Sequence, residues 1–123
     1  FESFYGSVDS EYENILLAEA AVRKAVPIVK TLNAREARRV RSGSVIVIEQ
    51  PSKQGKWKDG RQWDEFSSTK KFRFYRESGS QSRPLTKQVY SCEWKGQCFR
   101  IISYSDHGSR LLRPSDDPRL EPL

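Results

Sequence analysis

The stretch Lys53–Trp63 reads KQGKWKDGRQW, and a second stretch that follows it, Phe72–Arg76, reads FRFYR. Gly55 and the Asp59-Gly60 pair are typical of a loop or turn. Two tryptophans and several cations share this loop, although connecting loops are usually built from small polar residues. We therefore expect the loop to contact a partner, and we expect the segments on either side of it to include the strands that hold it.

The segments around this loop have the patterns of strands. Val45–Ile48 consists of β-branched residues only, which predicts a strand that is covered on both faces and lies near the centre of a sheet. Phe72–Arg76 alternates in polarity, which predicts another strand. Ser3–Val8 is short and aromatic and can form a further one. Asp64–Lys71 is polar, and we expect it to be mostly irregular.

The last part of the chain predicts a β-hairpin. Thr86–Trp94 and Gln97–Tyr104 flank the turn residues Lys95-Gly96. An isolated hairpin is marginally stable in water, so these strands should pair with the sheet formed by the first part of the chain. A stretch rich in Ser, with Gly and Pro, separates the two parts and reads as a linker.

Two helices are predicted near the N-terminus. Ser10–Glu13 has the form of a capping box, and apolar residues follow it at intervals of three and four. Pro27 should end this helix, which we place at 10–25. A second capping pattern precedes a shorter basic helix, which we place at 34–41.

Together these elements predict an α+β fold with two or so helices near the N-terminus and a largely antiparallel sheet. We expect one compact domain, 1–123, made of two interlocked lobes that share the sheet. The first lobe covers about 1–77, the linker 78–84 and the second lobe 85–123. The tail after Asp106 is expected to be extended, and three leucines could attach it to the body: Leu111, Leu112 and Leu120.

The charge of the chain favours a polyanionic partner. Lys and Arg number 22 against 16 Asp and Glu, which gives a net charge of +6 and a pI of about 9.5. Such a surface suits nucleic acid or an anionic membrane. No apolar run approaches the roughly 20 residues that a membrane span needs. The sequence therefore predicts no membrane span, and of the two polyanions we predict nucleic acid as the partner and no membrane.

The sequence offers little for catalysis or metal binding. Its one histidine, His107, has no obvious nucleophile or carboxylate partner, and no phosphate-binding glycine loop is present. Cys92 and Cys98 are too few for a zinc site or a disulfide framework. They could bridge across a turn of odd length but are out of register across a two-residue turn, and we favour reduced thiols. We predict no enzyme activity, cofactor, metal or small-molecule substrate.

Cations of the loop and of the helical region form the candidate site. Lys and Arg neutralise phosphates, and Arg is drawn into a narrow A·T-rich minor groove. We expect Trp63 to pack as the foundation of the loop, whereas the role of Trp57 stays open. In the loop the candidates are Lys53, Lys56, Trp57, Lys58, Gly60 and Arg61, and elsewhere they are Arg23, Lys24, Lys30, Arg35, Arg38, Arg39, Lys70 and Lys71.

Lys56–Trp63 resembles the Arg-Trp-Thr-Asp-Gly-x-x-Trp signature of the WOPR domain, which is found in fungal transcriptional regulators of morphology and cell fate. Ser42–Ile48 resembles the Ser-Gly-Ser-Val-Phe-Val-Phe strand of the same family. The further motifs that match, in the family's order, are Phe72–Glu77, Leu85–Gln88, Arg100–Tyr104 and Leu111–Pro118. The resemblance therefore covers nearly the whole chain.

The resemblance implies a nuclear, sequence-specific domain that binds double-stranded DNA at an A/T-rich element. It also implies two interlocked sub-regions and a Trp57–Trp63 loop that contacts a groove, with other cations on phosphates. The chain departs from the family pattern at Lys56 and Lys58, and it has Asp64-Glu65 where the family has Ser-Pro. Because two acids would repel phosphate, that segment must turn away from DNA or the site must differ.

Two other functions remain open at this point. Trp57, Phe72 and Tyr75 could be stacking platforms for single-stranded RNA or DNA. The exposed Trp and Arg side chains could instead be anchors in a protein interface. The basic helix could also be an ordinary solvated face.

Overall fold

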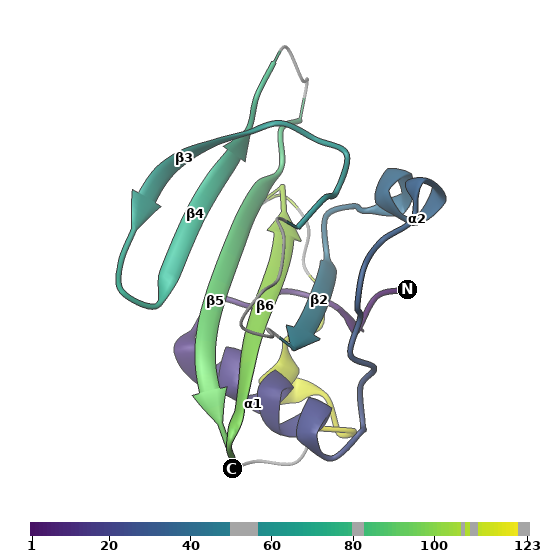
Figure 1. Ribbon diagram of the computed structural model, residues 1–123, viewed down its shortest axis with the longest axis vertical. Helices are drawn as coiled ribbons and strands as arrows, with labels where there is room; N and C mark the ends of the chain where they lie inside the picture. The colour runs from purple at the N-terminus through teal and green to yellow at the C-terminus, as the bar shows by residue number, and fades with distance from the viewer. Residues whose placement is uncertain (50–56, 80–82, 107, 109–110, 121–123) are drawn as a thin grey trace.

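The computed structural model describes residues 1–49, 57–79, 83–106, 108 and 111–120 (Figure 1). A six-stranded antiparallel sheet forms its centre, with the strand order β1-β2-β6-β5-β4-β3. The strands are β1 (Phe4–Tyr5), β2 (Ser44–Glu49), β3 (Trp63–Ser68), β4 (Phe72–Glu77), β5 (Thr86–Trp94) and β6 (Gln97–Ser105). The helices are α1 (Glu11–Val22), α2 (Ala34–Arg39) and a 3-10 turn, η1 (Pro114–Asp116). The expected α+β fold is confirmed.

The β5–β6 hairpin joins the two parts of the sheet. β6 pairs with β2 and β5 pairs with β4, so the hairpin lies between strands of the first lobe, as predicted. Its two-residue turn has positive φ at both Lys95 (50°) and Gly96 (80°). Cys92 is opposite Phe99 and therefore out of register with Cys98, and both thiols are free, as the sequence favoured.

Strand β2 is buried on both faces, as its β-branched run predicts. Val45 and Val47 pack on the side of α1, whereas Ile46 and Ile48 pack on the opposite side. The strand lies between β6 and the two-residue β1, so it is next to the short edge strand and not at the middle of the sheet.

Helix α1 covers one face of the sheet and passes behind the lower half of β5 and β6 in Figure 1. It begins at the predicted capping box, in which the Ser10 side chain accepts from the Glu13 N–H and the Glu13 side chain accepts from the Ser10 N–H. It ends at Val22, earlier than the expected residue 25, and Lys24 takes a left-handed φ of 61°. Its outer side is covered by η1.

The opposite face of the sheet is covered by α2 and its connection from α1. Asn33 and Glu36 cap α2 reciprocally, and Leu32 and Val40 on either side of the helix are buried against β2. No residue of α2 is itself buried. The helix is therefore held by Leu32 and Val40 at its two ends and by the partly buried Ala37, while its arginines are exposed.

Two further sequence-based expectations were wrong. Asp64–Lys71 was expected to be irregular, but 63–68 forms β3, which pairs with β4 through a bulge at Glu65/Ser67. The strand is the edge of the sheet and is exposed from Asp64 to Ser68, so its sequence shows no alternation between a buried and an exposed face. The tail was expected to be extended, but it contains η1. Leu120 is buried as expected, whereas Leu112 is exposed.

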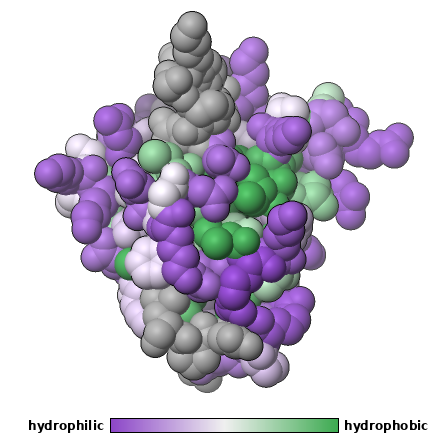
Figure 2. Space-filling model, turned by 60° about the horizontal axis from the view of Figure 1, so that its bottom comes forward, coloured by the Kyte–Doolittle hydropathy of each residue, from purple (hydrophilic) through white to green (hydrophobic). Residues whose placement is uncertain are grey.

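The surface is mainly hydrophilic on the face shown in Figure 2, which carries one compact apolar area. Within the described residues, the large apolar side chains that are exposed are Tyr5, Tyr12, Ile28, Phe66 and Leu112. None of the helices described is long and apolar enough to cross a membrane.

Candidate nucleic-acid interface

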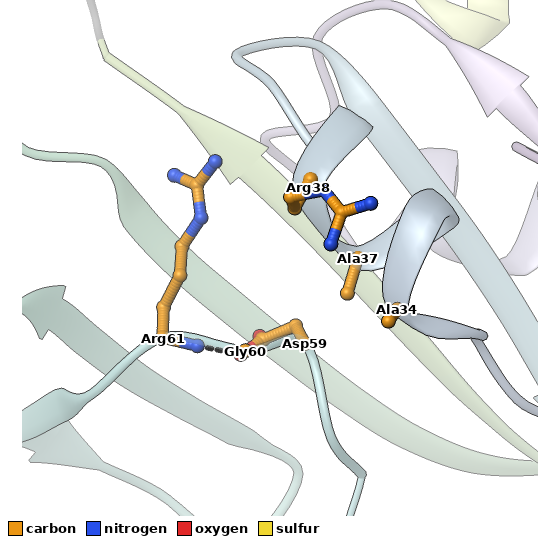
Figure 3. Close-up of a pocket in the computed structure, with 6 residues that line it drawn as sticks. All are labelled: Ala34, Ala37, Arg38, Asp59, Gly60 and Arg61. Carbon is orange, nitrogen blue, oxygen red and sulfur yellow. Dashed lines mark hydrogen bonds between the residues drawn. The ribbon is translucent and has the colours of Figure 1, made fainter.

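Helix α2 and the segment 57–61 lie side by side on the same face of the sheet and enclose an open groove of about 510 Å³. Ala34, Ala37 and Arg38 line it from the helix, and Asp59, Gly60 and Arg61 line it from the loop (Figure 3). Gly60 has φ of 78°, and a Cβ added there would lie 3.6 Å from the Cβ of Ala37. That distance is an ordinary van der Waals contact, so the left-handed φ, and not a lack of space beside α2, is what favours glycine at this position.

The carboxylate of Asp59 holds the loop together. Its Oδ1 accepts hydrogen bonds from the Arg61 backbone N–H (3.2 Å) and from Trp63 Nε1 (3.0 Å). Its Oδ2 accepts from Lys87 Nζ (3.2 Å) and from the Tyr104 hydroxyl (2.8 Å). The Tyr104 oxygen in turn accepts from Trp57 Nε1 at 3.0 Å. We call these side chains the Asp59 network: Trp57, Asp59, Trp63, Lys87 and Tyr104.

The network is a buried ion pair with neutral donors around it. Asp59 is 3% exposed and Lys87 is 8% exposed. Burial works to raise the pKa of Asp59, but the Trp63 hydrogen bond, the charge of Lys87 and the Tyr104 hydroxyl together hold that pKa below its usual value. Burial lowers the pKa of Lys87, and Asp59 partly offsets this. Burial and the nearby Asp59 charge raise the pKa of Tyr104. The tyrosine therefore stays a neutral donor.

Both tryptophans of the loop are structural supports. The Trp63 ring lies 5.8 Å from the Tyr104 ring, and the Lys87 ammonium lies 4.5 Å from the Trp63 centroid. This is the packing role expected for Trp63. Trp57 is half-buried against the same apolar cluster and donates its indole N–H to Tyr104. Trp57, whose role the sequence left open, therefore also has a packing role in this structure.

Arg61 extends from the loop to α2 and β4. Its Nη2 donates to the carbonyl of Val40 at 2.6 Å, just beyond the end of α2, and its Nη1 lies 3.6 Å from Glu77. The side chain is half-buried, and Figure 3 shows it pointing away from Asp59, across the groove from Arg38. Arg61 therefore fastens the loop to the helix in addition to lining the groove.

Several predicted cations surround this groove or lie on the connection that leads to it. In the described part of the chain, no carboxylate lies within ion-pair distance of their charged ends. These residues are Lys24, Lys30, Arg35, Arg38, Arg39 and Lys58, all exposed. Arg39 lies over the Phe1 ring at 5.6 Å. Because none of the acids in the described ranges pairs with these cations, their charges are exposed toward a polyanion.

The other predicted cations are placed differently. Arg23 pairs with Glu19 at 2.9 Å, and Lys71 pairs with Glu11 at 3.0 Å. Lys70 and Lys71 form the β3–β4 turn, at the side of the sheet away from α2 (Figure 1). Lys53 and Lys56 lie outside the described residues. The structure therefore brings α2 and Lys58 together but does not bring the β3–β4 turn to them.

The two acids after the loop point to the far edge of the sheet. Asp64 accepts from the Ser78 hydroxyl at 2.9 Å, and Glu65 lies 3.9 Å from Arg73. Both belong to β3, which runs along the edge opposite α2 (Figure 1). The segment therefore turns away from the groove, and its acids have partners of their own.

Sequence reasoning missed Lys87 and Tyr104 as parts of this site. It also assigned Asp59 to turn chemistry alone, and the hydrogen bond to Arg61 N is only one of the four that its carboxylate accepts. A usable signal existed, because Lys87 and Tyr104 stand in the second-lobe motifs Leu85–Gln88 and Arg100–Tyr104. What those motifs contact could not be seen without the fold.

Comparison with protein families matches residues 3–84 to the Gti1/Pac2 family. No curated protein matches the chain. Solved structures do match, and one of them, described as a fungal protein, has a TM-score of 0.77 and 20% identity over 98% of this chain and 84% of that chain.

Two further matches are the WOPR domain of Wor1 from Candida albicans in complexes with double-stranded DNA. The complex with 13-bp DNA has a TM-score of 0.74 and 24% identity, covering 98% of this chain and 94% of that chain. The complex with 17-bp DNA has a TM-score of 0.76 and 23% identity, covering 96% and 89%. The fold that the sequence resemblance implied is therefore shared with these proteins.

Proposed function

Because the chain belongs to the Gti1/Pac2 family, as the WOPR resemblance indicated, we propose that it is a double-stranded DNA-binding domain of a fungal transcription regulator, acting in the nucleus and without catalysis. Two of its structural neighbours are WOPR domains in complex with double-stranded DNA. We propose an A/T-rich target, which follows from the sequence resemblance and from the preference of Arg for narrow minor grooves.

The observation that carries this proposal is the position of α2 beside the 57–61 turn. Arg38 lines the groove from α2, and Lys58 is next in sequence to Asp59, which lines it from the turn. Neither cation has a carboxylate partner among the described residues, and the turn is fixed by hydrogen bonds to Asp59. A cation that is not already paired with a carboxylate can bind a phosphate without first breaking an ion pair, so it contributes more to DNA affinity. Arg38 and Lys58 are the proposed phosphate contacts, and the Gly60–Arg61 turn is the part proposed to enter a DNA groove.

A single-stranded ligand fits the structure less well. Stacking platforms must share one surface, but Phe72 packs with Tyr90 on the side of α1, whereas Tyr75 lies near Lys87 on the opposite face. Trp57 is packed against the core on that second face. The aromatic residues proposed for base stacking therefore do not form a continuous platform.

Salt dependence of DNA binding tests the proposal. Each phosphate contact contributes about 0.9 to the slope of log K against log salt, so binding to duplex DNA should weaken steeply as salt rises. Arg38→Gln should lower that slope by about 0.9 on every DNA sequence. Lys95→Gln removes the same charge at the remote hairpin turn and should leave the slope unchanged. Equal effects of the two variants, or a flat salt response of the parent domain, would contradict the proposal.

Selection of binding sites from random duplex DNA tests the sequence preference. An A/T-rich consensus is the expected result. Arg61→Ala should then reduce affinity for that consensus by about 1–3 kcal/mol and relax the preference, as expected for a groove-reading residue. Competition with single-stranded DNA and RNA of the same sequence provides the control. Stronger binding to either single strand would favour the alternative function.

A further inference from the structure

We propose that the buried Asp59–Lys87 pair is a positioning device for DNA recognition: it sets the shape of the Trp57–Arg61 turn, so the second lobe takes part in recognition without touching DNA. This inference rests on the proposed function, because DNA is the ligand for which the turn is shaped. It assigns a role in binding to Lys87 and Tyr104, neither of which can reach a phosphate.

The four donors to Asp59 come from separate parts of the chain. One belongs to its own turn (Arg61 N–H), one to the start of β3 (Trp63), one to β5 (Lys87) and one to β6 (Tyr104). Each hydrogen bond fixes a direction as well as a distance. The turn is therefore held in one position relative to the β5–β6 hairpin of the second lobe.

Burial separates this role from direct contact. The Lys87 ammonium lies 3.2 Å from Asp59, 4.5 Å from the Trp63 centroid and 5.1 Å from the Tyr75 centroid. Its charge is enclosed by these groups, so it cannot pair with a phosphate. It is nevertheless needed, because a buried carboxylate without a cation is costly.

The geometry also explains why an ion pair occupies a place that apolar side chains could fill. Apolar replacements for a buried ion pair are often as stable or more so, so stability alone does not require one. Apolar packing is not directional, however, whereas this carboxylate orients the turn and both flanking indoles. The turn then lies against α2, where Gly60 and Arg61 share the groove with Arg38.

A measurable consequence follows for affinity. If the turn takes other shapes, only the fraction of molecules in the held shape binds, and the apparent Kd rises by the inverse of that fraction. A turn that is correctly shaped about one tenth of the time would show an approximately tenfold weaker Kd. The loss should occur in molecules that remain folded.

The test compares three variants of the whole domain. Lys87→Met removes the cation, Tyr104→Phe removes one hydroxyl and no charge, and Arg113→Met removes a partner of the buried Glu13 on the opposite face of the sheet. Binding to a duplex of the selected consensus is measured by fluorescence anisotropy, well below the lowest Tm of the set. We expect Kd to rise about tenfold for Lys87→Met, several-fold for Tyr104→Phe and less than about twofold for Arg113→Met.

A second measurement does not depend on DNA. Acrylamide quenching is followed in a Trp94→Phe background, in which Trp57 and Trp63 are the remaining tryptophans. Quenching should rise for Lys87→Met and Tyr104→Phe but not for Arg113→Met. If quenching does not change, the pair does not position the turn and the inference is wrong, whether or not the domain binds DNA.

Two other outcomes are decisive. Raised quenching with unchanged DNA affinity would show that the shape of the turn does not matter for binding, and would overturn the inference while leaving the proposed function intact. Losses of affinity that follow Tm equally in all three variants, Arg113→Met included, would assign the pair to stability alone. A parent domain that binds no duplex DNA would refute the proposed function by itself, and the quenching result would still decide the positioning of the turn.

Discussion

Asp59 and Glu13 are buried carboxylates on opposite faces of one sheet, and they differ in where their partners come from. Glu13 is 2% exposed and accepts a hydrogen bond from the nearby Ser10 N–H. It also accepts two from the Arg113 guanidinium of the tail, at 2.8 and 3.0 Å. Asp59 accepts from Trp63 and from the second-lobe residues Lys87 and Tyr104. Glu13 thus fastens the tail to a helix end, whereas Asp59 fastens a proposed contact loop to the sheet.

The two sites also differ in how closely they are enclosed. The Arg113 side chain is 43% exposed, so water can reach Glu13 if the arginine is removed. The Lys87 side chain is 10% exposed and is covered by aromatic rings, so its loss leaves Asp59 in a dry site. The same type of substitution should therefore have different costs on the two faces.

Among these substitutions, Lys87→Met should cause the largest loss in the free energy of unfolding. Breaking a buried pair by removing one partner costs about 3–5 kcal/mol, and we expect a value near the lower end because Asp59 keeps three neutral donors. Urea denaturation measures this free energy of unfolding. Asp59→Asn combined with Lys87→Met should recover part of the loss, since no buried charge then remains. Failure of the double variant to recover any stability would contradict the ion-pair account.

Arg113→Met should have a smaller effect. Hydrogen bonds to charged groups contribute about 1.5–3 kcal/mol, and the exposure of Arg113 places the expected loss near 1.5 kcal/mol. Its matched control is Arg119→Met, whose partner Asp117 lies on the tail itself. That variant should lose less, because it breaks a contact within the tail. A loss for Arg113→Met as large as that for Lys87→Met would remove the proposed difference between the two faces.

The smallest expected effect is on how steeply stability falls at low pH, compared between the parent domain and Asp59→Asn. Despite burial, which acts to raise them, the hydrogen bonds and cations around Asp59 and Glu13 hold both pKa values below the usual 3.8 and 4.5. A carboxyl whose pKa is lowered on folding contributes stability that is present above its unfolded pKa and is lost as pH falls through its folded pKa. Stability should therefore decline below about pH 4.5. Asp59→Asn should be less stable at neutral pH but should decline less steeply in acid, as measured by urea titrations at several pH values.

Local signals in the sequence predicted local contacts on both faces. The capping boxes of Ser10–Glu13 and Asn33–Glu36 and the Lys95-Gly96 turn depend on residues three or fewer positions apart, and the structure contains all of them. The buried run of β2 was equally readable, because its β-branched residues leave no polar face.

Long-range partners were not predictable in this way. Nothing near Glu13 in the chain indicates Arg113, and nothing near Asp59 indicates Lys87, because strand order decides both contacts. Edge strand β3 was missed for a related reason, since it gains its structure from pairing with β4 and has no apolar pattern of its own. The candidate cations were predicted from composition, but only the fold separates those at the α2 groove from those paired elsewhere.

The place of the β5–β6 hairpin between β2 and β4 has a consequence for biosynthesis. β1, which precedes β2, pairs with only two of its residues, and the long partner β6 comes much later in the chain. The apolar run Val45–Ile48 therefore leaves the ribosome before the strand that covers most of its length. Short apolar β-branched segments in this state can associate between chains. We therefore expect a newly made chain to lose its tendency to aggregate when the β5–β6 hairpin is complete and β6 can pair with β2, and not when the first lobe is complete.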